Sequence, residues 1–71
     1  MNRYLVIYEK TATGYSAYVP DLPGVIATGK TKLSTEKNIY EAICFQLEGL
    51  ALEKLPIPKS STLGEVMVFA K

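Results

Sequence analysis

The chain has 71 residues, of which 48% are hydrophobic and 21% are charged, and its formal net charge is +1. A chain this short predicts a single domain over residues 1–71, and the composition is typical of a folded protein. Because the charge is close to zero and no apolar run reaches the length of a membrane span, we expect neither direct nucleic-acid binding nor membrane insertion.

Three short segments with alternating apolar residues follow one another at the start of the chain. They predict strands over residues 3–9, 15–19 and 25–28. In the first strand, Tyr4, Val6 and Tyr8 share one face. Short connections join the segments, the first of them ending in Gly14, so we expect an antiparallel meander of three strands.

A rigid turn is predicted after the second strand, in the sequence Pro20-Asp21-Leu22-Pro23-Gly24. Pro20 removes a backbone donor and Pro23 fixes another φ, so the strand ends abruptly. Asp21 can hydrogen-bond the backbone just after it, and Gly24 permits a positive φ. We therefore expect a loop of fixed shape at the end of the second strand.

A helix is predicted over residues 33–53. Thr31 or Ser34 is the expected N-cap, because either hydroxyl can accept a hydrogen bond from a free amide of the first turn. Gly49 weakens the last turns by about 1 kcal/mol relative to alanine. Pro56 ends the helix, because it biases the preceding residue towards an extended conformation.

The predicted helix carries apolar residues on two nearly opposite sides. The larger stripe is expected to pack on the sheet and consists of Ile39, Tyr40, Ile43, Leu47 and Leu50. Phe45 and Leu52 lie two turns apart on the other side, which Glu41 and Glu48 share. Single exposed apolar residues are common on protein surfaces, so this pair indicates either an ordinary surface or an interface.

The end of the chain reads as a last strand over residues 65–70, in which Val66 and Val68 alternate with Met67 and Phe69. We expect this strand to return to the sheet and to pair with the first strand. The chain is thus predicted to be an α+β domain with the element order β-β-β-α-β.

Reactive side chains are scarce. The chain has no histidine, which excludes catalytic triads, cysteine–histidine pairs and histidine metal sites. Its one cysteine, Cys44, cannot form an intramolecular disulfide and has no basic neighbour that would activate the thiol. A lone cysteine favours a reducing, cytoplasmic compartment. We expect no enzyme activity and no cofactor.

Four pieces of the sequence are informative as an ordered set. They are Tyr4–Glu9, Gly14–Gly24, Ala27–Thr31 and the helix around Asn38–Leu50. Together they cover most of the first 58 residues or so, and the set resembles the HicB family, the antitoxin partners of HicA toxins that cleave messenger RNA. The resemblance implies a degenerate RNase H-like fold whose role is protein binding and through which family members often oligomerise.

The resemblance implies a HicB-like antitoxin of a type II toxin-antitoxin system, which binds a HicA-like toxin and blocks its active site. The residues expected at the partner interface are Tyr18, Pro20, Asp21, Leu22, Pro23, Phe45 and Leu52. The alternative is an orphan HicB-like domain without a toxin partner, and in both cases we expect a homo-oligomer, a dimer or larger. Residues 59–71 are too few for the DNA-binding domain of many family members, so operator binding by this chain alone is not expected.

True RNase H folds hold two divalent ions with clustered carboxylates. The candidates in this chain are Glu9, Asp21, Glu41 and Glu48. They are dispersed over the predicted elements and are not expected to converge within the roughly 4 Å metal spacing that such catalysis needs. We therefore expect neither a metal site nor nuclease activity.

Overall fold

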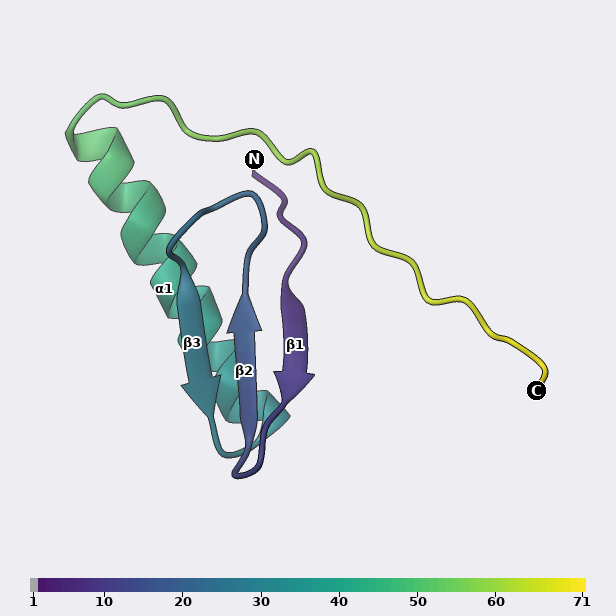
Figure 1. Cartoon of the computed structure of the whole chain (residues 1–71). Coiled ribbons are helices and arrows are strands. Elements are labelled where there is room, and N and C mark those ends of the chain that lie inside the picture. Colours follow the sequence, from purple (N-terminus) through teal and green to yellow (C-terminus); the bar gives the residue numbers. More distant parts are fainter. Residues whose placement is uncertain (1) are drawn as a thin grey trace.

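An antiparallel sheet of three strands is covered on one face by a long helix (Figure 1). The computed structural model describes residues 2–71. Its elements are β1 (Ile7–Lys10), β2 (Tyr15–Tyr18), β3 (Ile26–Gly29) and α1 (Lys32–Leu52). The strands pair in chain order, and both pairs are antiparallel. The predicted α+β class, with a meander followed by a helix, is confirmed.

Strand β1 begins later than the first strand that the sequence predicts. The register pairs Ile7 with Tyr18, which is the last residue of β2. Beyond Tyr18 the chain turns at Pro20, which has no backbone donor to continue the ladder. Residues 3–6 therefore extend past the end of β2 without a ladder partner.

Alternation along the strands separates a helix-facing side of the sheet from an open side. On the helix-facing side, Ala17 of β2 lies between Tyr8 of β1 and Ala27 of β3. The buried apolar core consists of Ala17, Val19, Leu22, Val25 and Ile39. Tyr4, Val6 and Tyr8 pack against it, which confirms the predicted common face. The core thus joins β2, the turn after it and the middle of α1.

Helix α1 begins with a capping box made by two hydroxyl residues. Thr31 is the N-cap, and the Ser34 amide donates to its hydroxyl at 3.0 Å. In return, the Thr31 amide donates to the Ser34 hydroxyl at 3.1 Å. Ser34 therefore does what a carboxylate or an amide side chain usually does at this position. Both residues that the sequence singled out contribute, with Thr31 as the cap.

The buried stripe of α1 is narrower than predicted. Thr35 and Ile39 are buried, and Ile43 and Leu47 pack around them half-buried. Tyr40 was expected in this stripe but is 68% exposed. It follows Ile39 directly and is therefore rotated from it by about 100° around the helix axis, which turns its ring away from the sheet. Over residues 2–71, no helix combines the length and the apolar character that a membrane span needs.

The helix ends in a left-handed residue that is not glycine. Lys54 has a φ of 58°. Its amide donates to the Ala51 carbonyl at 3.1 Å, and the Leu55 amide donates to the Leu50 carbonyl at 2.9 Å. This pair of bonds is the Schellman pattern, in which glycine usually occupies the left-handed position. The predicted end of the helix before Pro56 is confirmed.

The predicted final strand over residues 65–70 is absent from the structure. After α1 the chain has no regular secondary structure, and in Figure 1 it passes the N-terminal segment and then leaves the sheet. Val66 is 92% and Val68 94% exposed. We call residues 65–70 the C-terminal tail. Within residues 2–71 it has no ladder partner, because the chain directs it away from β1 instead of along it.

Candidate functional site

The residues expected at a partner interface lie in separate parts of the fold. Tyr18 ends β2, and the turn of residues 20–24 follows it. Phe45 and Leu52 lie on α1, in the other layer of the molecule (Figure 1). The fold does not gather them into one surface.

The open side of the sheet carries a row of three apolar side chains. The register aligns Ile7, Tyr18 and Ile26 across the three strands. Ile26 is 66% exposed, and Tyr18 is also exposed. We call Ile7, Tyr18 and Ile26 the sheet-face patch. Only Tyr18 was expected to contact a partner. The alternation of Ile26 with the inward-facing Val25 and Ala27 is the sequence signal that identifies the outward position.

The turn after β2 is closed by backbone hydrogen bonds, as expected for the loop of fixed shape that the sequence predicts. The Leu22 amide donates to the Val19 carbonyl at 3.0 Å, and the Val25 amide donates to the Leu22 carbonyl at 3.1 Å. Gly24 has a φ of 87°, a backbone angle that L-residues with a side chain rarely adopt. Leu22 is only 2% exposed. Its expected role at an interface is therefore corrected, because its side chain lies in the core and cannot reach a partner.

Asp21 ties this turn to the segment that follows α1. Its Oδ2 accepts hydrogen bonds from the backbone amides of Ser61 and Thr62, both at 3.0 Å. Its Oδ1 accepts from the two hydroxyl groups, that of Ser61 at 3.2 Å and that of Thr62 at 2.9 Å. The expected bond to the backbone just after Asp21 is replaced by these long-range bonds. We call this arrangement the Asp21 clamp.

The hydrogen bonds of the Asp21 clamp have an electrostatic consequence. They lower the pKa of Asp21, first through the backbone amide of Thr62 and then through that of Ser61, because both stabilise the charged carboxylate. The carboxylate is thus engaged inside the chain. It shapes the surface of the turn and has little capacity left to bind a partner directly.

Phe45 and Leu52 are exposed along one side of α1. A shallow hollow next to them is lined by Phe45, Gln46, Gly49, Leu50, Glu53 and Leu55. A Cβ atom at Gly49 would meet no other group within 4 Å. We call Phe45, Gly49 and Leu52 the helix flank. It is accessible, as an interface requires.

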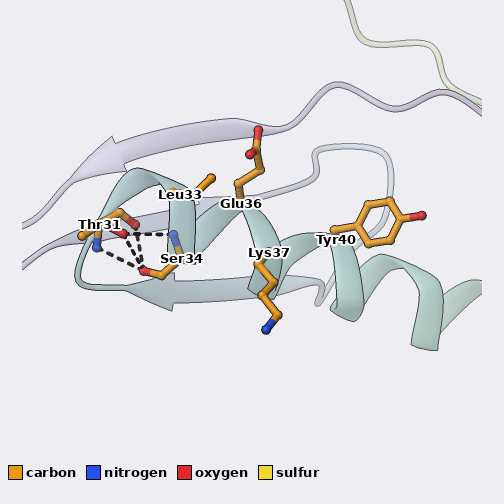
Figure 2. Close-up of a pocket in the computed structure, with 6 residues that line it drawn as sticks. All are labelled: Thr31, Leu33, Ser34, Glu36, Lys37 and Tyr40. Carbon is orange, nitrogen blue, oxygen red and sulfur yellow. Dashed lines mark hydrogen bonds between the residues drawn. The ribbon is translucent and has the colours of Figure 1, made fainter.

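A second hollow lies at the start of α1 (Figure 2). Its lining residues are Thr31, Leu33, Ser34, Glu36, Lys37 and Tyr40. Leu33 and Tyr40 are exposed there, and Figure 2 shows the Tyr40 ring pointing away from the capping box. This hollow was missed at the level of the sequence because Tyr40 was assigned to the buried stripe.

The described part of the chain contains no cluster of reactive side chains. Within residues 2–71, no three histidine, cysteine, aspartate or glutamate residues are placed to hold a metal ion. Cys44 is an exposed free thiol on α1. The surface features described above for residues 2–71 are apolar patches, hollows and a hydrogen-bonded turn.

Comparison with known protein families covers almost the whole chain. Residues 4–70 match the family described as HicB_like antitoxin of bacterial toxin-antitoxin system. The chain belongs to the HicB-like antitoxin family. The resemblance inferred from the sequence is thereby confirmed. The match also extends through the C-terminal tail, so the tail is part of what defines a HicB-like domain.

Two curated relatives overlap this HicB-like chain to different extents. An uncharacterized 14.9 kDa protein from the rep-hol intergenic region of Haemophilus phage HP1 is 37% identical over 62 residues, which make up 87% of this chain and 47% of the phage protein. The UPF0150 protein Ta0767 of Thermoplasma acidophilum is 40% identical over 69 residues, 96% of this chain and 99% of that protein. The chain thus spans about half of the phage relative and nearly all of the Thermoplasma relative.

A solved structure also shares the fold. It is a chain of the HicA3 and HicB3 toxin-antitoxin complex, with a TM-score of 0.66 and 34% sequence identity. The similarity covers 78% of this chain and 64% of that chain. The three-stranded sheet and helix of this HicB-like chain are therefore an architecture found in a toxin-antitoxin complex.

Proposed function

We propose that this chain is the antitoxin of a type II toxin-antitoxin system, and that it inhibits a small HicA-like, messenger-RNA-cleaving toxin by direct protein contact. The observation that carries the proposal is the shared fold, at 34% identity, with a chain of the HicA3 and HicB3 complex. Inhibition of this kind needs no chemistry from the antitoxin, because covering the active site of the toxin is enough to exclude RNA. The chain acts as a binding protein and not as an enzyme.

In this proposal the toxin binds the sheet-face patch and the adjoining turn. Tyr18 and Ile26 offer apolar contact area, and the tyrosine adds a polar group at its tip. Pro20 and Pro23 stiffen the turn, and the Asp21 clamp ties it down. A surface held in one shape loses little conformational entropy on binding, which favours affinity. With a net charge of +1, association depends on shape and apolar contact more than on electrostatic steering.

The proposal has three further parts. The chain acts in the cytoplasm, where the free thiol of Cys44 stays reduced. It binds no nucleic acid directly, since its net charge of +1 supplies no counterpart for a phosphate backbone. It self-associates, as a dimer or larger, on a degenerate RNase H-like scaffold that serves only as a framework for contact.

The alternative function is that of a homo-oligomeric HicB-like protein with no toxin partner. The exposed apolar tail is compatible with it, because Met67 and Phe69 lie in solvent and gain from self-contact with or without a toxin. The helix flank would then be a second self-contact.

Co-purification of this chain with the product of the adjacent gene distinguishes the two functions. The proposal predicts a stable hetero-complex whose mass, read by light scattering, accounts for both proteins. A chain that elutes as a homo-oligomer and retains no toxin supports the alternative.

Two matched substitutions locate the toxin-binding surface. Ile26→Asp places a charge in the sheet-face patch, and Phe45→Asp places the same charge on the helix flank; both positions are exposed, so neither change removes core packing. The proposal predicts that Ile26→Asp weakens toxin binding by about tenfold or more, whereas Phe45→Asp leaves it unchanged. The opposite pattern would place the toxin on the helix flank.

A further inference from the structure

The C-terminal tail is the most strongly apolar feature that the fold leaves unused. Val66 and Val68 alternate with Met67 and Phe69, and all four side chains are exposed. Alternation of β-branched and large apolar residues is typical of a strand. The family match reaches residue 70, so the tail belongs to the domain. A strand-like segment that belongs to the domain but lies in solvent requires a partner.

The tail also makes the molecule more elongated than a compact domain with the same number of residues. The radius of gyration is 13.9 Å, and the extents are 49 × 26 × 18 Å. A compact chain of the same length would have a radius of gyration of about 11 Å. Figure 1 shows the cause, because the segment that ends at the C-terminus projects away from the sheet and helix.

The sheet has two edges, and the edge of β1 is the less occupied of the two. Strand β1 lies at one edge of the order β1-β2-β3, and within residues 2–71 its outer N–H and C=O groups face no other strand. Such an edge pairs readily with another extended segment. At the opposite edge, Asn38 of α1 donates to the Thr28 carbonyl of β3 at 2.8 Å, and α1 packs mainly on β3 and β2. The helix therefore contacts the β3 side of the sheet more than the β1 side, which makes β1 the more accessible edge.

Contacts with the rest of the fold fix the path of residues 58–64, which lead into the tail. The Tyr4 hydroxyl donates to the Pro58 carbonyl, and the Asp21 clamp fixes residues 61 and 62. A Cβ atom at Gly64 would lie only 3.1 Å from Leu5 Cδ2, so the chain is close to the N-terminal segment there. These contacts present the tail at the β1 side of the molecule, pointing outward.

We infer that residues 65–70 of one copy add as a strand to the free edge of β1 in a second copy, which returns the same contact. Reciprocal exchange closes a two-fold dimer, because each tail finds a ladder and each β1 edge is covered. The inference rests on the proposed self-association of this chain and names the segment and the edge that produce it.

The test measures the mass of the full chain by light scattering over a range of concentrations. The variant Val66→Lys with Val68→Lys puts two charges into the tail, and Phe45→Lys is the matched control on the helix flank. Lysine in a strand opposes edge pairing. The wild-type chain is expected to be a dimer, the tail variant to raise the dissociation constant of the dimer by about tenfold or more, and the control to remain dimeric. Circular dichroism confirms that each variant stays folded, as expected for exposed positions.

Two results would overturn the inference. A wild-type chain that stays monomeric at high concentration has no strand exchange. A dimer that survives the tail variant but dissociates in Phe45→Lys has its self-contact on the helix flank. Inhibition of the toxin is assayed separately. A dimer that fails to inhibit therefore contradicts the antitoxin role and not the strand exchange. A toxin-inhibiting monomer contradicts the strand exchange, together with the self-association on which it rests, and leaves the antitoxin role intact.

Disulfide trapping distinguishes exchange from closure within one chain. In a Cys44→Ser background, chains with Glu9→Cys are mixed with chains carrying Val68→Cys and are oxidised. Exchange predicts a linked dimer of the two variants, whereas Leu33→Cys mixed with Val68→Cys should give none. If instead a single chain with both Glu9→Cys and Val68→Cys forms an internal disulfide as a monomer, the tail closes on its own β1 and the inference is wrong.

Discussion

Asp21 and Thr62 are joined by two hydrogen bonds although 41 positions separate them: the Thr62 amide donates to Oδ2 at 3.0 Å, and its hydroxyl donates to Oδ1 at 2.9 Å. Ser61 adds two more bonds to the same carboxylate. The turn of residues 20–24, which proline and glycine already predict from the local sequence, is thus also fixed by residues 61 and 62. The turn adjoins the surface proposed to bind the toxin, and the clamped segment leads into the tail proposed for exchange.

The Asp21 clamp predicts a dependence on acid. The hydrogen bonds hold the pKa of Asp21 below its usual value in the folded state. The clamp therefore contributes its full stabilisation above the pKa of an unfolded aspartate, about 3.9, and loses it as the pH falls through the lowered folded value. NMR titration should show the amide signals of Ser61 and Thr62 unchanged between pH 7 and about 5 and shifting together below about 3.9.

Asp21→Asn is the control for this titration. The amide side chain keeps one acceptor but carries no charge, so the bonds from Ser61 and Thr62 weaken at neutral pH. Their amide signals should already be shifted at pH 7 and should lose the acid transition. If the transition persists in Asp21→Asn, another carboxyl group causes it.

Gly29→Ala is expected to destabilise the fold. A Cβ atom at this position would lie 2.6 Å from both the Ser34 hydroxyl and the Thr35 hydroxyl, and 2.8 Å from the Thr35 amide. The end of β3 and the first turn of α1 would have to separate, which costs about 1–3 kcal/mol. Urea denaturation measures this as a lower midpoint with an unchanged slope. An unchanged midpoint would mean that the two elements are less tightly packed than the structure indicates.

Gly49→Ala is also a glycine-to-alanine substitution, but it is expected to stabilise the fold. A Cβ atom at Gly49 meets no other group within 4 Å, so it causes no clash. Replacing glycine by alanine inside a helix raises the free energy of unfolding by about 0.5–1 kcal/mol. The melting temperature should rise. A fall would show that Gly49 makes a close contact in the assembled protein, such as one across the helix flank.

Lys54→Gly should stabilise the end of α1. The left-handed backbone at Lys54, with a φ of 58°, costs an L-residue about 1–2 kcal/mol, and glycine removes most of this cost. Part of the gain is lost because glycine is more flexible in the unfolded chain, which leaves about 0.5–1 kcal/mol. Lys54→Ala removes the charge without freeing φ and should give no gain. Equal stabilisation by both would assign the effect to the charge.

Much of the fold could be predicted from local patterns. Two-residue alternation identified the common face of Tyr4, Val6 and Tyr8, and capping chemistry identified Thr31 and Ser34. Proline and Gly24 marked the turn. These features depend on neighbours within a few residues, which is why the sequence alone was sufficient.

The predictions that the structure contradicts depend on contacts between distant parts of the chain. No local pattern encodes the partners of Asp21, because Ser61 and Thr62 lie beyond the helix. The exposure of Tyr40 depends on how α1 sits over a narrow sheet, and one position along the helix separates it from the buried Ile39. Residues 65–70 have the composition of a strand, but a ladder also needs the segment to lie along a neighbour. The path of the chain directs these residues away from β1, which no local pattern encodes.

The most direct test of the central claim is a titration of this chain into an RNA-cleavage reaction catalysed by a HicA-like toxin. The proposal predicts that cleavage of a labelled messenger RNA falls with added chain and stops near a fixed molar ratio, as expected for tight stoichiometric inhibition. Undiminished cleavage with the chain in large excess would contradict an antitoxin function.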